Sequence, residues 1–143
     1  MNAHEHIAAF VAAQTVATVC CTNADQQLHC FSCYYAFDAG QTLLYFKTSA
    51  DTQHMQWLQA MPQTAGSILP NKLQKLVVKG IQWSGVLLAE DDPLAAHAGK
   101  QYHLKYPFAL AMPGTVRTIR LDTLKMTDNS LGFGSKVHWK RGE

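Results

Sequence analysis

Three segments with the composition of β-strands lie between residues 15 and 48, and only short polar connections separate them. "TVATVCCT" is followed by the turn sequence "NADQQ" and then by "LHCFSCYYAF", which predicts a hairpin. A second turn at "DAG" leads into "TLLYFK". Parallel neighbours need a crossover of about a dozen residues or more, and these connections are shorter. The order of the segments therefore predicts an antiparallel meander.

The rest of the chain adds further strands and a few short helices. Helical spacing predicts helices over residues 3–14, from Lys47 to Pro62, and over residues 91–107, where Asp92 precedes Pro93 as a cap precedes a first turn. Strand patterns cover residues 64–69, 76–90, 116–126 and 137–141. We expect bulges or bends at Gly80 and Gly85 and a break near Asp122. The sequence "GFGS" near the C-terminus is typical of a tight turn.

These elements predict one β-dominated α+β domain over residues 1–143, an antiparallel barrel of about six strands with short flanking helices. A length of 143 residues with 48% hydrophobic composition is enough to bury one core. The formal charge of +2 and the scattered basic residues argue against nucleic acid. No segment has the pattern of a signal peptide or a membrane span, so we expect a cytoplasmic protein with reduced cysteines.

The stretch "YFKTSADTQHMQWL" changes from an apolar run to a dense series of polar groups where a strand is expected to meet a helix. Unpaired backbone amides and the helix dipole favour an anion at such a place, and a nearby cation and hydroxyls would add to it. The candidate phosphate ligands are Lys47, Thr48, Ser49, Thr52, Gln53 and His54. A simpler interpretation stays open, in which the hydroxyl side chains merely cap the helix.

The order of these parts resembles the pyridoxamine 5'-phosphate oxidase-like FMN-binding split barrels. The resemblance rests on an N-terminal helix, a hairpin with "HCFSCYYAFD", then "LYFKTSADTQHMQ", the glycine-bearing strand "VKGIQWSGVLL", a helix and a closing strand. The tail "IRLDTLKMTDNSLGFGSKVHW" is similar to a small bacterial family within that superfamily. The resemblance covers nearly the whole chain and implies a split β-barrel.

The resemblance also implies a homodimer that binds FMN at the subunit interface. The phosphate would lie at the six candidate ligands, and the second strand would run beside the isoalloxazine ring. The ring contacts implied by position are Phe31, Ser32, Cys33 and Tyr34. Trp139, next to Lys140 and Arg141, would reach the site of the partner subunit, whereas Trp83 is expected in the core.

The chain departs from pyridoxamine 5'-phosphate oxidases where those enzymes carry basic residues. Ser32, Tyr35, Gln53 and His54 stand in roughly those places. Fewer permanent cations would face the phosphate, so we expect weaker binding, or binding that depends on pH if His54 must be protonated. Oxidation of pyridoxamine 5'-phosphate itself is therefore not expected.

The four cysteines give no standard metal motif, although they cluster with His29. Along a strand, Cys30 and Cys33 would point to opposite faces, which argues against one shared ion. A hairpin turning at residues 24–27 would place Cys21 opposite Cys30, as a thiol pair or, when oxidised, a disulfide. We therefore predict no metal site.

Two classes of function follow from these observations. In the first, the protein is an FMN-dependent oxidoreductase that acts on a small molecule, with the flavin carrying the chemistry. In the second, it binds a flavin or haem without turnover, as a carrier or sensor. A third hypothesis is an empty dimeric barrel that acts through partners. No residue stands out as a catalytic acid or base.

Overall fold

The computed structural model describes residues 2–131 and 135–143. The predicted turn "GFGS" falls largely on residues 132–134, outside the described residues. In chain order, the elements are α1 (Ala3–Ala13), β1 (Val16–Thr22), β2 (Leu28–Asp38), β3 (Leu43–Thr48), α2 (Gln53–Ala60), β4 (Gln63–Ile68), β5 (Lys79–Leu87), η1 (Pro93–Ala95), α3 (Ala98–Lys105), η2 (Pro107–Ala111), β6 (Thr115–Asp128), η3 (Asn129–Leu131) and β7 (Lys136–Lys140).

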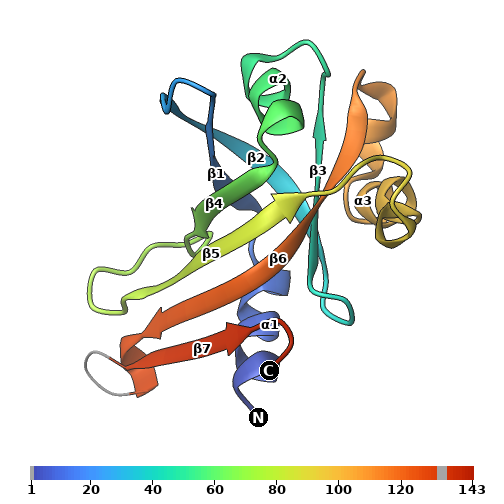
Figure 1. Ribbon diagram of the computed structural model, residues 1–143. Coiled ribbons are helices and arrows are strands. Elements are labelled where there is room, and N and C mark those ends of the chain that lie inside the picture. Colours follow the sequence, from blue (N-terminus) through green and yellow to red (C-terminus); the bar gives the residue numbers. More distant parts are fainter. Residues whose placement is uncertain (1, 132–134) are drawn as a thin grey trace.

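The strands form one antiparallel sheet that closes on itself. Its order is β3-β2-β1-β4-β5-β6-β7, and β3 also pairs with β6, so β1 to β6 make a barrel and β7 extends it beside β6. Figure 1 shows α2 at one end of the barrel, α1 with β7 at the other, and α3 outside, beside β3 and β6. The predicted split barrel and its initial meander are confirmed.

The third strand is buried on both faces, which explains its almost continuous apolar sequence "LLYFKT". Leu44 and Phe46 point into the barrel and join the main core, whereas Leu43 and Tyr45 point outward. The outward pair packs with Ala98, Tyr102, Tyr106 and Ala109 of the α3–η2 segment. Residues of β3 with odd numbers therefore face α3, and those with even numbers face the barrel interior.

The predicted break near Asp122 is a bulge within a continuous strand. Ser84 pairs with Thr123 but Gly85 pairs with Leu121, so Asp122 is the extra residue in β6. Gly85 is needed there because a Cβ on it would lie 2.4 Å from the backbone oxygen of Arg120. Gly80, by contrast, pairs with Thr127 in regular register, so no bulge occurs at Gly80.

Three predicted elements differ in extent. The helix predicted between Lys47 and Pro62 covers only Gln53–Ala60, because β3 continues to Thr48 and Thr52 caps the helix. The segment predicted as one helix over residues 91–107 is divided into η1, capped by the carboxylate of Asp92, and α3, which begins after His97. The strand predicted over residues 76–90 extends over β5 alone. No helix among the described residues has the length and apolar character needed to cross a lipid bilayer.

The predicted pairing of Cys21 with Cys30 is wrong by one position. Thr22 pairs with Leu28, so the hairpin loop contains five residues, and Gln26 within it has a φ of 62°. The four-residue turn assumed from the sequence would shift the register by one residue, and a shift of one moves every side chain to the other face. Cys20 consequently lies opposite Cys30, and Cys21 lies opposite His29.

Trp83 belongs to the core, as predicted from its place in the barrel wall. Its side chain is 3% exposed and packs over Gly66 of the neighbouring strand. A Cβ on Gly66 would lie 2.4 Å from the indole ring and 1.9 Å from the backbone oxygen of Thr18. The large ring and the missing side chain are therefore complementary.

Candidate functional site

A pocket of about 400 Å³ lies outside the barrel, where β2 and β3 meet the segment from α3 to β6. We call it the outer pocket. Its lining residues are Ser32, Cys33, Tyr34, Lys47, Tyr102, Phe108, Ala109, Met112 and Pro113. Pockets of this size are typical of small-molecule sites, and the lining combines aromatic faces with a single cation.

Strand alternation selects which residues of β2 and β3 reach the outer pocket. Phe31 and Cys33 pack against the barrel core, so the side chains of Ser32 and Tyr34 face outward. On β3, Lys47 follows Tyr45 on the outer face. Tyr34 is 50% exposed and Phe108 is 59% exposed, which leaves two aromatic side chains at the mouth of the pocket without full cover.

The ammonium group of Lys47 is held in place by a backbone carbonyl and a histidine ring. Its Nζ donates to the backbone oxygen of Ala109 at 2.6 Å and lies 3.1 Å from Nε2 of His103. Among residues 2–131 and 135–143, no carboxylate lies within 4.0 Å of this Nζ. The positive charge is therefore oriented but not neutralised, and an anion in the pocket would be attracted to it.

The α3 wall of the outer pocket is fixed to β2 by a tyrosine. Tyr106 donates from its hydroxyl to the backbone oxygen of Tyr35 at 2.6 Å, and its ring lies 5.0 Å from that of Tyr102. Burial, with the neighbouring Tyr102, raises the pKa of Tyr106 to about 12. Burial also raises the pKa of the Cys33 thiol to about 12, so this cysteine stays protonated at neutral pH.

A second polar group lies on the other face of the sheet, where β3 passes into α2. Oγ1 of Thr48 lies 2.8 Å from Nε2 of His54, and the His54 ring stacks on Phe31. Thr52 caps α2, because its Oγ1 accepts from the backbone N–H of Met55 at 3.3 Å. Burial, with a smaller contribution from His29, lowers the pKa of His54. We call Phe31, Thr48, Thr52 and His54 the junction cluster.

The predicted site residues thus fall into two groups, with Trp139 apart from both. Ser32, Cys33, Tyr34 and Lys47 line the outer pocket. Phe31, Thr48, Thr52 and His54 form the junction cluster, with Ser49 and Gln53 beside them in the chain; the Gln53 amide lies 3.4 Å from His29. Lys47 and Thr48 are neighbours in sequence but point to opposite faces, because they lie in a strand.

Trp139 lies far from both groups in this chain. It is on β7, opposite Leu124, and its ring is 5.5 Å from that of His4 at the α1 end of the barrel. Figure 1 shows that α1 and β7 lie at the end opposite α2. A contact of Trp139 with a partner subunit's site stays a prediction.

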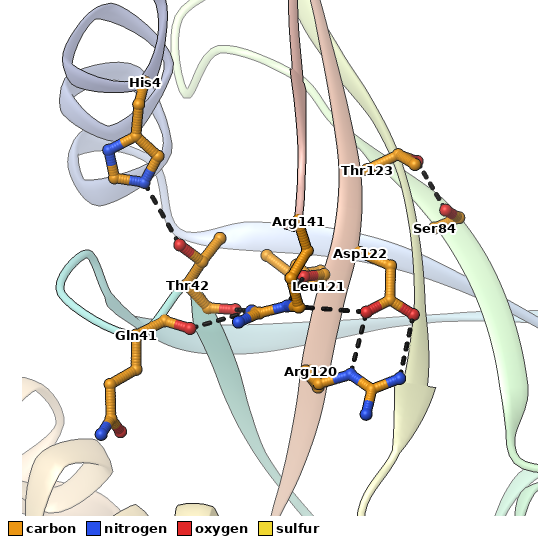
Figure 2. Close-up of polar contacts among 9 residues, drawn as sticks. All are labelled: His4, Gln41, Thr42, Ser84, Arg120, Leu121, Asp122, Thr123 and Arg141. Atoms are coloured by element: carbon orange, nitrogen blue, oxygen red, sulfur yellow. Dashed lines mark hydrogen bonds and ion pairs between the residues drawn. The ribbon is translucent and has the colours of Figure 1, made fainter. Parts of the chain in front are cut away.

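Figure 2 shows a polar network that joins Arg141, whose guanidinium lies 5.5 Å from the Trp139 ring centroid, to the β6 bulge. Arg141 donates from Nε to the Leu121 oxygen and from Nη2 to the Thr42 oxygen, both at 2.9 Å. Asp122 accepts from Arg120 at 2.9 Å and lies 3.6 Å from Arg141. Burial lowers the pKa of Arg141, and Asp122 opposes that effect. Backbone carbonyls and the Asp122 carboxylate already contact the guanidinium groups of Arg120 and Arg141. We therefore assign this network to stabilisation of the fold.

The sequence interpretation missed the α3–β6 wall of the outer pocket. Tyr102, Phe108, Met112 and Pro113 come from this wall. The signal was the run "YPFALAMPG", which is apolar, contains two prolines and fits neither a helix nor a strand pattern. Among the described residues, no group of three or more His, Cys, Asp or Glu side chains is placed to hold a metal ion.

Comparison with curated proteins gives relatives over nearly the full length. The chain is 35% identical over 139 residues to a UPF0306 protein from Serratia proteamaculans (strain 568), covering 96% of this chain and 94% of that protein. It is 36% identical over 135 residues to the UPF0306 protein YhbP from Salmonella schwarzengrund (strain CVM19633), covering 94% and 91%. No family model matches the chain.

Comparison with solved structures finds proteins with a similar fold but low sequence identity. A haem-binding protein from Mycobacterium smegmatis matches 98% of this chain with a TM-score of 0.81 and 15% identity, and the chain spans 58% of that protein. An FAD-binding protein from Mesorhizobium loti matches with a TM-score of 0.67 and 16% identity, covering 87% and 93%. HutZ, a haem storage protein from Vibrio cholerae, matches with a TM-score of 0.63 and 14% identity. The match covers 85% of this chain and 89% of that protein.

Proposed function

The chain belongs to the UPF0306 family and has a split-barrel fold, and from this premise we propose that its outer pocket binds FMN. The observation that carries the proposal is the Lys47 ammonium, which faces a pocket lined by aromatic side chains and has no carboxylate within 4.0 Å among the described residues. A flavin phosphate would supply the missing negative charge, and the flavin ring would cover exposed aromatic surface.

The residues of the outer pocket suit the two parts of FMN differently. Tyr34, Tyr102 and Phe108 offer aromatic faces for the flat ring, and the Ser32 hydroxyl offers a hydrogen bond at its edge. Lys47 would attract the phosphate. Of the other predicted ligands, Ser49 and Gln53 follow β3 in the chain and would add hydrogen bonds to the phosphate.

The junction cluster contributes less to this proposal than its sequence suggested. The Thr48 and Thr52 hydroxyls are already engaged with His54, Ser49 and the first turn of α2. The lowered pKa of His54 favours its neutral form at neutral pH, so it would not add a full positive charge to a phosphate site. We therefore expect Lys47 to dominate the electrostatic attraction.

A homodimer is part of the proposal. Tyr34, Phe108 and Met112 line the outer pocket, and Leu104 and Leu110 lie in the α3 and η2 helices that form its wall; each of the five is at least half exposed, from 50% for Tyr34 to 69% for Leu110. An apolar surface of this kind beside a pocket is typical of an interface. A second copy packed there would cover the open side of the bound cofactor.

Haem is the alternative cofactor, since two of the similar structures are haem proteins. Haem iron usually takes an axial ligand such as histidine. In the described part of the chain, the lining of the outer pocket contains no histidine, and His103 beside it points Nε2 toward Lys47. The chemistry of the lining thus favours a flavin over haem.

We propose further that the protein is an oxidoreductase for an unidentified small molecule. Bound FMN would supply hydride transfer. The chain itself would orient the ring, exclude water with its aromatic side chains and balance charge through Lys47. Burial raises the pKa of Tyr102, so its hydroxyl stays protonated at neutral pH and can act in the pocket as a hydrogen-bond donor.

The test begins with the visible absorption spectrum of the purified protein before and after addition of FMN. We expect a retained flavin spectrum. Lys47→Ala should weaken the binding of FMN by about tenfold or more, whereas the affinity for riboflavin should change little. Lys100→Ala, which removes an exposed lysine from α3, is the matched control. A Soret band, or equal losses of FMN and riboflavin affinity, would count against the proposed site.

Turnover is tested separately from binding. With bound flavin, a nicotinamide cofactor should bleach the flavin absorbance, and an added acceptor should restore it. If the flavin stays oxidised with every donor, the oxidoreductase proposal is wrong and the protein only binds the flavin.

A further inference from the structure

We propose that Cys20 and Cys30 form a reversible redox site, which is oxidised to a disulfide by exchange with small-molecule disulfides. The two residues lie directly opposite each other in the β1–β2 pair, and their Sγ atoms are 2.9 Å apart. Both are free cysteines in this structure. The proposal does not depend on the cofactor.

The pair lies on the outer face of the barrel, where a reagent can reach it. Val19 and Cys21 point into the core, so Cys20 between them points outward. Cys30 is exposed and Cys20 is partly exposed. A cross-strand pair of this kind brings the two Cβ atoms close enough for a disulfide without a change of register.

The other two cysteines lack these properties. Cys21 is 3% exposed, and its thiol faces the backbone oxygen of His29 at 3.6 Å. Cys33 packs against the barrel core, and burial raises the pKa of its thiol to about 12. The structure therefore separates one reactive pair from two inert core thiols.

The exchange proceeds in two balanced steps. The thiolate of Cys30 attacks one sulfur of a disulfide RSSR, which forms a mixed disulfide and releases the first RS⁻. The thiolate of Cys20 then attacks the Cys30 sulfur, so the protein disulfide forms and the second RS⁻ leaves. The two thiol protons of the protein end on the two released thiolates. The protein loses two electrons, and RSSR becomes two RSH.

The order of attack follows from the surroundings of each thiol. Burial, together with the neighbouring Cys30, raises the pKa of Cys20 to about 11, so little Cys20 thiolate exists at neutral pH. The first attack therefore falls to the more exposed Cys30. The contact between the two sulfurs makes the second attack intramolecular, which offsets the scarcity of Cys20 thiolate.

The redox site adjoins the outer pocket. Cys30 precedes Ser32 by two residues on the same face of β2, and Ser32 lines the pocket. Phe31, between them, belongs to the junction cluster. A disulfide at Cys30 would thus stiffen the strand that forms one wall of the pocket.

The experiment uses the full-length protein and oxidised glutathione as the probe. After incubation, mass spectrometry of the intact protein should show a loss of two hydrogen atoms, and peptide mapping without reduction should join residue 20 to residue 30. Of the four cysteines, two should then react with a thiol reagent after denaturation. Dithiothreitol should restore all four.

Variants distinguish the proposed steps. Cys20→Ser should trap a stable glutathione adduct on Cys30, whereas Cys30→Ser should block most of the reaction. Cys21→Ser and Cys33→Ser serve as controls and should still form the link. A lasting mixed disulfide on the wild-type protein, a link to Cys21, or four unreacted thiols would each overturn the proposal. The peptide map of the wild-type protein decides this even if a variant does not fold.

Discussion

The imidazole ring of His54 stacks on the phenyl ring of Phe31, with ring centroids 3.7 Å apart and an angle of 14° between the planes. This contact joins the beginning of α2 to β2. The same imidazole contacts the Thr48 hydroxyl through Nε2. His54 therefore links three consecutive elements, and its protonation state bears on how firmly α2 closes this end of the barrel.

Protonation of His54 should destabilise the protein. Its pKa in the folded chain lies below the ordinary 6.5, so the unfolded chain binds a proton more readily and stability rises with pH through this window. We expect the unfolding free energy to fall between about pH 7.5 and about pH 5, and His54→Gln to reduce that fall. Urea unfolding at both pH values measures it. His138→Gln, on the exposed face of β7, should not change the slope; an unchanged slope in His54→Gln would refute the assignment.

Gly66→Ala should lower the free energy of unfolding by about 3 kcal/mol or more. The added methyl would lie 1.9 Å from a backbone oxygen and 2.4 Å from the Trp83 ring, and neither can move freely within the barrel wall. Gly99→Ala is the matched control, because no atom lies within 4 Å of its added Cβ. In helix α3, that change should stabilise by about 0.5–1 kcal/mol. Equal effects of the two substitutions in thermal unfolding would contradict this packing argument.

Asp128→Asn should destabilise the protein by about 1–3 kcal/mol at neutral pH. The carboxylate is buried and accepts hydrogen bonds from Ser130, with His6 at 3.4 Å and Lys79 at 4.0 Å. Burial alone raises the pKa of Asp128, but these hydrogen bonds and charges outweigh it, and the net pKa is lowered below 3.8.

Asp128 and His54 both have a lowered pKa, but for different reasons. Hydrogen bonds and nearby charges stabilise the charged form of Asp128, whereas burial disfavours the charged form of His54. The stabilisation from Asp128 is present above its ordinary pKa of 3.8 and is lost as the pH falls through the lower folded value. Acid unfolding of the wild-type protein should therefore be steeper than that of Asp128→Asn. Asp25→Asn, in the exposed hairpin loop, should leave the steepness of acid unfolding unchanged.

Arg141→Ala should lower the unfolding free energy by about 2 kcal/mol. Arg141 donates to three backbone oxygens, on Leu121, Gln41 and Thr42, and its guanidinium lies 5.5 Å from the Trp139 ring centroid. Lys140→Ala removes a neighbouring exposed charge and should have little effect. Calorimetry of both variants tests this, and a similar loss in each would show that general charge, rather than the network in Figure 2, is responsible.

Leu110→Glu should dissociate the proposed homodimer. Leu110 is 69% exposed beside the outer pocket but does not line it. A charge buried in an apolar interface is unfavourable, so light scattering after size exclusion should show a shift to the monomer mass. Leu76→Glu, at a position 91% exposed on the opposite β4–β5 connection, is the control. A wild-type protein that is already monomeric would remove the dimer from the proposal.

The local elements of this fold could be predicted from the sequence because each one carries its own signal. Alternation and turn residues identified β1 to β3, and the Asn23–Gln27 loop between β1 and β2 was placed to within one residue. That one residue decided which cysteine faces Cys30. Register depends on the loop conformation, including the positive φ of Gln26, which composition does not specify.

The candidate site was predictable in part for a related reason. Ser32, Cys33, Tyr34 and Lys47 were identified and do meet at the outer pocket. Thr48 and His54 were grouped with Lys47 because they are close in sequence, yet a strand places Lys47 and Thr48 on opposite faces. The α3–β6 wall comes from a segment without regular periodicity, so its position depends on tertiary packing that no local pattern encodes.

The closure of β3 onto β6 has a consequence for behaviour at high concentration. A strand inside a closed barrel has both of its edges paired and cannot recruit a strand from another molecule. In the described part of the chain, β7 pairs with β6 alone, so no strand covers its outer edge. Lys136, His138 and Lys140 alternate along that short strand and point to solvent. The charges of Lys136 and Lys140 would repel an identical edge, which protects β7 from edge-to-edge aggregation.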